Sequence, residues 1–155
     1  MGFRNCGLAS GEGAVALPPL TIWALRVALC YLGIGFSLGA VMLGAQETPL
    51  AVTVLQLRPL HLELLLIGWT VQLAMAVAYW ILPRHQGSGR EKRWLAVSAL
   101  LLLNLGVVSV GVGAVLGVPR PILVAGRAAE LTGALCFAAH AWSRVRAYSF
   151  RKFAR

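Results

Sequence analysis

Hydrophobic residues along the chain fall into four long runs that are separated by short polar or proline-containing stretches. Each run has about 20 or more residues, the length that an α-helix needs to cross the hydrocarbon core of a bilayer. Such runs are helical in a membrane because a helix satisfies its own backbone hydrogen bonds. The pattern predicts an all-α fold, an integral membrane bundle of four transmembrane helices with spans over 20–44, 60–82, 94–116 and 121–142.

Prolines and charges set the ends of the predicted second span. Pro83 stops it, and the loop over 84–93 that follows is the most hydrophilic part of the chain. Residues 50–57 are apolar but short, and Pro59 separates them from the span, so we expect an interfacial segment there. Almost nothing is left for a soluble domain. We therefore divide the chain into a cytoplasmic tail over 1–19, a transmembrane domain over 20–145 and a basic cytoplasmic tail over 146–155.

The basic residues are distributed unevenly between the two ends of this bundle. Four spans place both termini and the central loop on one side, and that side holds eleven of the 14 lysines and arginines. The other side holds Arg58, Arg120 and Arg127. Since cytoplasmic segments of membrane proteins carry such an excess, we predict an N-in, C-in orientation, with 45–59 and 117–121 facing outward. The expected location is the bacterial inner (plasma) membrane.

A net charge of +9 would suggest a nucleic-acid ligand in a soluble protein, but it has another explanation here. Only 12% of the residues are charged, and the mean hydropathy is +0.77. Basic loop residues of a membrane protein lie beside anionic lipid headgroups. We therefore expect the lipid bilayer as their partner and no nucleic acid. The three cysteines show no ligand spacing, so we expect neither a zinc site nor a disulfide framework.

Polar residues in the second span share one helical face with small and apolar ones. A face that contacts lipid would be uniformly apolar, so this stripe is predicted to face protein or a buried ligand. Glu63 does not share the face, and its simplest role is a carboxylate in the first helical turn that pairs with Arg58. The stripe consists of His61, Leu65, Gly68, Gln72, Ala76 and Tyr79.

The fourth span contains the most deeply placed acid of the chain, Glu130. Arg127 lies three residues before it, a spacing that allows an ion pair and lowers the cost of holding both charges near the membrane. Two roles remain open for Glu130, a proton relay and a structural pair with Arg127. We favour the structural pair.

Small residues in the first and third spans predict where helices approach one another. Gly35 and Gly39 are four residues apart in the first span, and Gly106, Ser109 and Gly113 share one side of the third. Lipid gives helices no hydrophobic drive to associate, so small residues that permit close packing line their interfaces. We predict packing faces at both places; the alternative is the edge of a closely approaching cofactor.

Imidazole is a common ligand of haem iron and of other metals, and the chain has three histidines. His61 is predicted near the outer end of the second span, and His85 and His140 near the inner end. This difference in depth prevents His61 and His140 from holding one haem together, and His85 lies in the solvated loop. A histidine at the end of a membrane helix is also commonly a hydrogen-bonded structural residue. The chain has no aspartate and no Ser-His-acid set, so ordinary soluble-enzyme chemistry is not expected.

One stretch of about 25 residues in the second span resembles a known family. It begins with His61, contains Gly68-Trp69 and Gln72, and ends in Tyr79-Trp80-Ile81-Leu82-Pro83-Arg84. This string resembles the second transmembrane helix of the haem–copper oxidase catalytic subunit (subunit I), especially in the branch close to nitric-oxide reductases. The resemblance implies that His61 is the metal ligand, an axial ligand of a haem b. It also implies that Gly68 allows close approach and that Gln72 and Tyr79 belong to the same cofactor site.

The chain also departs from that family. It has four predicted spans, far fewer than the catalytic subunit, and it lacks the histidines that hold copper, so we do not expect it to be an enzyme on its own. The second axial histidine has no counterpart either. A six-coordinate haem would therefore need a ligand from a second chain, such as His61 of a twin subunit.

Three functions remain open at this level. The first is a haem-binding or respiratory-complex-associated membrane protein, in electron transfer or oxidase support, with a homo-oligomer or respiratory-complex subunits as partners. The second is a non-haem scaffold or accessory membrane subunit. The third is a small oligomeric transporter in which Gln72, Asn104 and Glu130 line a polar path.

Overall fold

Four helical segments of the chain are long and apolar enough to cross a membrane. The structure, a computed structural model, describes residues 17–82 and 93–152, with side chains up to residue 142. Every regular element in these residues is a helix, which confirms the all-α fold and the four helices of membrane-spanning length and composition. Most of the predicted N-terminal tail and of the central loop lies outside the described residues. The four segments are Pro19–Gly44, Ala51–Ile81, Arg93–Leu116 and Arg120–Trp142.

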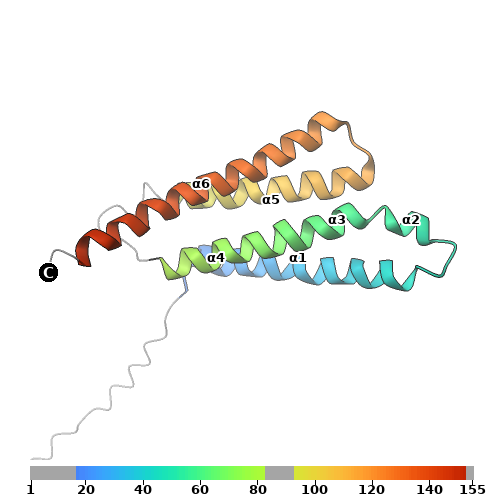
Figure 1. Ribbon diagram of the computed structural model, residues 1–155, viewed down its shortest axis with the longest axis horizontal. Helices are drawn as coiled ribbons and strands as arrows, with labels where there is room; N and C mark the ends of the chain where they lie inside the picture. The colour runs from blue at the N-terminus through green and yellow to red at the C-terminus, as the bar shows by residue number, and fades with distance from the viewer. Residues whose placement is uncertain (1–16, 83–92, 153–155) are drawn as a thin grey trace, which may run out of the picture.

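The helices form two hairpins that lie side by side (Figure 1). In the first, α1 runs along a segmented helix made of α3, η1 and α4; in the second, α5 runs along α6. The start of α1 and the end of α6 lie at one end of the bundle, and α2 lies at the other. The bounds are α1 Pro19–Gly44, α2 Ala51–Leu55, α3 Arg58–Glu63, η1 Leu64–Val71, α4 Gln72–Ile81, α5 Arg93–Leu116 and α6 Arg120–Lys152.

Prolines stand in the first turn of three of these helices, and Pro121 is the one in α6. Pro19 stands in the first turn of α1, and Pro59 in the first turn of α3. Proline suits this position because the first backbone N–H groups of a helix have no intrahelical acceptor. Upstream of Pro59, the short helix α2 occupies the segment that the pattern predicts to be interfacial, and Gln56 and Leu57 form the turn between α2 and α3.

The second span is not α-helical throughout, although its hydrophobic pattern predicts a regular helix. Residues 64–71 form the π-helix η1 between α3 and α4. In it the Thr70 hydroxyl donates a hydrogen bond to the Leu65 carbonyl, five residues back, at 2.9 Å. A π-turn accommodates an extra residue and turns the two flanking helical halves relative to each other. The regular stripe predicted over the whole span is therefore interrupted at its centre.

The fourth span also differs from its predicted limits. Helix α6 continues to Lys152, past the predicted span end at 142 and into the predicted tail over 146–155. No glycine or proline follows Gly133, so the sequence contains no residue that would stop the helix where the apolar run ends. The change in polarity after residue 142 therefore does not end the helix.

Glycines hold α5 and α6 together. A Cβ on Gly106 would lie 2.8 Å from the Gly126 carbonyl oxygen, and a Cβ on Gly133 would lie 2.7 Å from the Ala99 carbonyl oxygen. Such distances mean that the two backbones approach closely, as small residues permit in membranes. Gly113 packs against Val118 in the same hairpin. The packing face predicted for the third span is confirmed.

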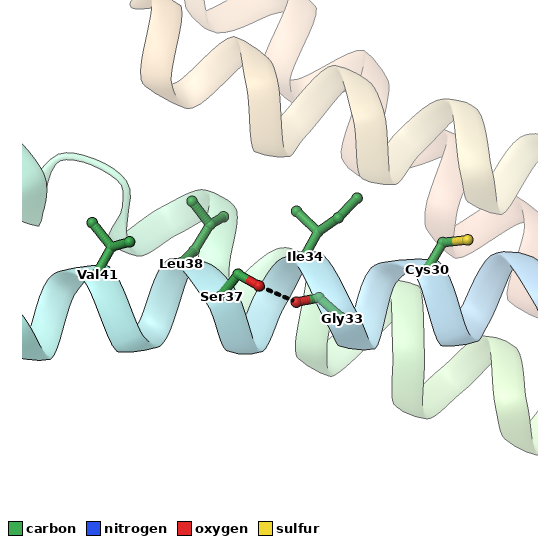
Figure 2. Close-up of a pocket in the computed structure, with 6 residues that line it drawn as sticks. All are labelled: Cys30, Gly33, Ile34, Ser37, Leu38 and Val41. Atoms are coloured by element: carbon green, nitrogen blue, oxygen red, sulfur yellow. Dashed lines mark hydrogen bonds between the residues drawn. The ribbon is translucent and has the colours of Figure 1, made fainter.

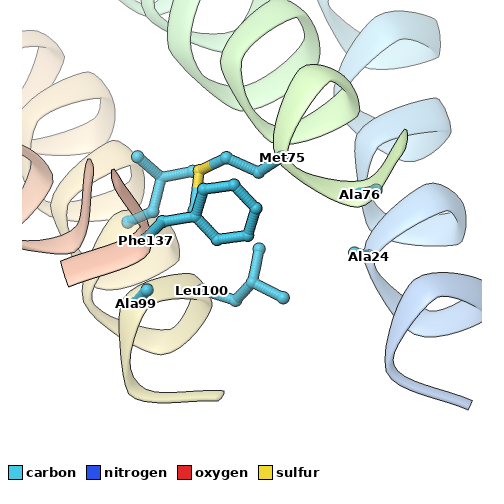
Figure 3. Packing of buried hydrophobic residues seen from close by; sticks show 7 residues of the cluster. Ala24, Met75, Ala76, Ala99, Leu100 and Phe137 are labelled. Atoms are coloured by element: carbon cyan, nitrogen blue, oxygen red, sulfur yellow. The ribbon is translucent and has the colours of Figure 1, made fainter. Parts of the chain in front are cut away.

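The core lies where all four spans meet (Figure 3). The Phe137 ring of α6 packs beside Met75 of α4 and Leu100 of α5. Ala24 and Ala76 keep α1 close to α4. Large apolar side chains are instead common on the outer surface, where lipid would surround them, because acyl chains are as apolar as leucine.

Candidate functional site

His61 is held against α1 by a backbone carbonyl. Its Nδ1 lies 2.8 Å from the Gly35 carbonyl oxygen. A carbonyl only accepts hydrogen bonds, so Nδ1 carries a proton in this contact, and the tautomer with a single ring proton keeps the lone pair on Nε2. The ring fits because position 39 is glycine: a Cβ there would lie 2.8 Å from His61 Cε1. The predicted packing face at Gly35 and Gly39 is confirmed, and its occupants are Leu65 and His61.

Gly68 is a point of close approach, and its neighbour is a protein side chain. The Tyr31 ring of α1 packs on it, and a Cβ on Gly68 would lie 2.7 Å from Tyr31 Cδ2. Gly68 is buried at the centre of η1. The family resemblance implies that a cofactor lies close to Gly68. In the structure the Tyr31 ring lies there instead.

Gln72 belongs to a polar network that links three helices. Its Nε2 donates to the Ala24 carbonyl at 3.1 Å, and its Oε1 accepts from Asn104 Nδ2 at 2.8 Å. Asn104 Nδ2 also donates to the Leu100 carbonyl at 2.7 Å, and Asn104 Oδ1 accepts from the Tyr31 hydroxyl at 2.8 Å. Gln72 is fully buried. Both polar ends of the Gln72 amide are thus satisfied inside the bundle.

Sequence analysis alone did not find Tyr31 as a member of this network. The available signal was its spacing from Gly35: the two residues are four apart, and residues four apart lie on one face of a helix. Since that face packs on the second span, a phenol at position 31 is placed to reach a buried polar group. Nothing in the sequence says which one.

Tyr79 lies at the far end of the predicted stripe and contacts α6. Its ring stacks on His140 with the centroids 5.9 Å apart and the planes at 19°. His140 is 1% exposed and also lies beside Phe137, at 6.3 Å between centroids. Tyr79 is 18 residues from His61, or about 27 Å of helix at 1.5 Å per residue. The structure therefore does not bring Tyr79 and His61 into one site.

A cluster of charges occupies another face of the second span. Arg127 of α6 binds Glu63 of α3 through two contacts, Nη1 to Oε1 at 3.0 Å and Nη2 to Oε2 at 2.6 Å. Its Nη1 also binds Glu130 Oε2 at 2.8 Å. The predicted Arg127–Glu130 pair is confirmed. The predicted pair of Glu63 with Arg58 is wrong, because Glu63 points across Gly111 of α5 toward α6.

Two hollows in the surface contain none of the predicted site residues. The first, of about 470 Å³, runs along one face of α1 (Figure 2). In it the Ser37 hydroxyl donates to the Gly33 carbonyl at 2.8 Å. The second, of about 540 Å³, lies at the end of the bundle near Arg58 and Leu55. The first is lined by Cys30, Gly33, Ile34, Ser37, Leu38 and Val41.

Among residues 17–82 and 93–142, no three His, Cys, Asp or Glu side chains lie together as a metal-binding group. A bare metal ion would thus lack a full set of protein ligands there. A porphyrin brings its own nitrogen ligands, so a single imidazole suffices to attach a haem iron. Haem ligation is therefore a metal chemistry for which the single imidazole of His61 would suffice.

No family model, curated protein or solved structure matches the chain. The resemblance to the oxidase subunit therefore depends on the residues of the second span alone.

Proposed function

We propose that this chain is a haem-binding, respiratory-complex-associated membrane protein. In this proposal His61 is one axial ligand of a haem b, and both termini lie in the cytoplasm of a bacterial cell. A bound haem b would supply a one-electron carrier, and the chain would act in electron transfer or in oxidase support. The protein's own contribution is to orient the ligand and to hold it in the membrane.

The observation that carries the proposal is the hydrogen bond from His61 Nδ1 to the Gly35 carbonyl. Metal-ligating histidines characteristically donate their second ring N–H to a carbonyl or carboxylate, which sets the tautomer and the ring orientation. In this chain that bond leaves Nε2 as the atom with a lone pair. No other described residue forms a hydrogen bond to His61 Nε2.

The proposal assigns haem contact to His61 alone. Gly68, Gln72 and Tyr79 have packing partners within the bundle, so we give them structural roles in the present arrangement. The second ligand would come from another chain on the side of α1. This helix is the least covered span, with 11% of its most apolar window buried against 44% for α5.

A reduced-minus-oxidised visible spectrum of the purified protein, expressed with haem supplied, tests the proposal. We expect a b-type spectrum in the wild type and in His85→Ala, and its loss in His61→Ala. His61→Gly separates ligation from folding, since imidazole added to the buffer should restore the spectrum if the missing ring is the only defect. A colourless wild type, or a spectrum that survives in His61→Ala, would overturn the proposal.

A second candidate is an accessory membrane subunit that binds no haem. The observation in its favour is the closed stripe of the second span, in which Tyr31 fills the space at Gly68 and Ala24 accepts from Gln72. A colourless protein that co-purifies with a respiratory complex would support this candidate.

The transporter reading gains no support from the arrangement of the polar residues. Asn104 and Gln72 bond to each other and to α1, whereas Glu130 packs against Gly106 on another face of α5. These groups lie on two sides of one helix and do not form a single line.

A further inference from the structure

The charge cluster of Glu63, Arg127 and Glu130 contains one carboxylate oxygen that Arg127 does not bind. The guanidinium binds both oxygens of Glu63 and Oε2 of Glu130. Glu130 Oε1 is buried and has no hydrogen-bond partner among the residues that the structure describes. An ionised carboxylate would normally have each oxygen solvated or bonded, so this oxygen requires an explanation.

Burial makes the imbalance costly. Glu63 is 4% exposed and Glu130 7% exposed. Two ionised carboxylates facing one guanidinium would leave an uncompensated negative charge within a membrane span. Glu130 is also deep: it lies ten residues after the first residue of α6, or about 15 Å along the helix, which is half of a hydrocarbon core of about 30 Å.

No other described element supplies a charge that would correct this imbalance. From α5 the neighbour of Glu130 is Gly106, where a Cβ would collide with the glutamate side chain. From α6 it is Arg127, and from α3 it is Glu63, which carries the same charge as Glu130. Asn104 of α5 is engaged on the other side of that helix.

We propose that the cluster is a proton-binding site within the membrane, in which Glu63 and Arg127 form the ion pair and Glu130 holds one proton on Oε1. A proton at this position neutralises the excess charge without displacing any observed contact. The site would release and rebind the proton when the balance of charge around Arg127 changes. The proposal does not depend on His61 or on haem.

Labelling with dicyclohexylcarbodiimide tests the site, because this apolar reagent reacts with protonated carboxyl groups. The full chain in detergent micelles would be labelled at pH 6 and at pH 9, digested and read by tandem mass spectrometry. We expect one adduct, on Glu130, that decreases at the higher pH. Glu130→Gln should lose the adduct, and Glu47→Gln, which alters an exposed loop carboxylate, should keep it.

Glu63→Gln gives the more discriminating result. Removal of that carboxylate leaves Arg127 with a single acid, so Glu130 should ionise and its labelling should fall about tenfold or more although Glu130 itself is unchanged. An adduct on Glu63, no adduct on either acid, or unchanged labelling of Glu130 in Glu63→Gln would overturn the proposal. Protection of wild-type Glu130 by sodium but not by choline would identify a sodium site instead and would also overturn it.

Discussion

At the scale of single residues, the polar side chains of the bundle do two different kinds of work. Tyr31, Gln72 and Asn104 satisfy one another in a buried network, which holds α1, α4 and α5 at fixed rotations. His61 uses one ring nitrogen for a backbone carbonyl, and we propose that the other binds a ligand. The polar network fixes how the helices pack. The second ring nitrogen of His61 is the atom to which we assign a chemical role.

Asn104→Leu should destabilise the bundle. The substitution leaves the Tyr31 hydroxyl and Gln72 Oε1 without their partner, and hydrogen bonds of this kind between membrane helices are worth about 0.6 to 1.7 kcal/mol each. We expect a loss of about 1–2 kcal/mol in the free energy of unfolding, measured by titration from mild detergent into SDS. Thr132→Ala removes only a bond to its own helix and should change little. Equal losses in both variants would contradict the network.

Gly39→Ala should disturb His61. The added methyl group would lie 2.8 Å from His61 Cε1, so the ring or the helix must move. Overpacking of this kind costs about 1–3 kcal/mol, and if the chain binds haem as we propose, the haem spectrum should weaken with it. The matched control is Gly33→Ala in the same helix, where nothing lies within 4 Å and alanine should be neutral or mildly stabilising. Both variants would be compared by SDS titration and by spectrum.

At the scale of elements, the second span is the most unusual helix. Its two halves are α-helical, and η1 between them turns the second half so that Tyr79 reaches α6 while His61 remains on α1. Part of this helix could be predicted from the sequence: the glycine and the amide of the stripe do face protein. The π-turn could not, because no proline or polar break marks it and it depends on how Tyr31 packs on Gly68.

Deletion of Thr70 should be better tolerated than deletion of Leu101. A π-turn holds one extra residue, so removal of Thr70 lets η1 become an ordinary α-helix while its two flanks keep their faces. Deletion of Leu101, an exposed residue in the regular helix α5, turns Asn104 and everything after it by about 100°. We expect folded monodisperse protein by gel filtration for the first deletion and aggregation for the second. The reverse order would contradict the assignment of η1.

At the scale of the whole molecule, the two hairpins place the start of α1 and the end of α6 at the same end of the bundle (Figure 1). The bundle could be foreseen in outline from the hydrophobic runs. Which face of each helix is covered could not: α5 is the most buried span and α1 the least. Long-range pairs such as Glu63 with Arg127, 64 residues apart, also required the assembled bundle.

The orientation predicts the behaviour of reporter fusions in a bacterial host. A green fluorescent protein fused after Arg155 should fluoresce, and alkaline phosphatase fused there should be inactive, because the excess of basic residues predicts that this end lies in the cytoplasm. Alkaline phosphatase inserted after Thr48, in the opposite loop, should be active. An active phosphatase at the C-terminus would reverse the topology and would place the acceptor nitrogen of His61 toward the cytoplasmic side.

The sequence by itself determined the number of membrane-spanning helices, their approximate limits and the expected direction of insertion, because hydrophobic length, proline position and loop charge act locally. Only the tertiary structure decided the partners of the polar groups. In a bilayer no hydrophobic force orients one apolar helix against another, so rotation is set by close glycine contacts, by buried hydrogen bonds and by ion pairs. Those contacts join residues far apart in the chain. Tyr31 packs on Gly68, Asn104 donates a hydrogen bond to Gln72, and Arg127 forms an ion pair with Glu63.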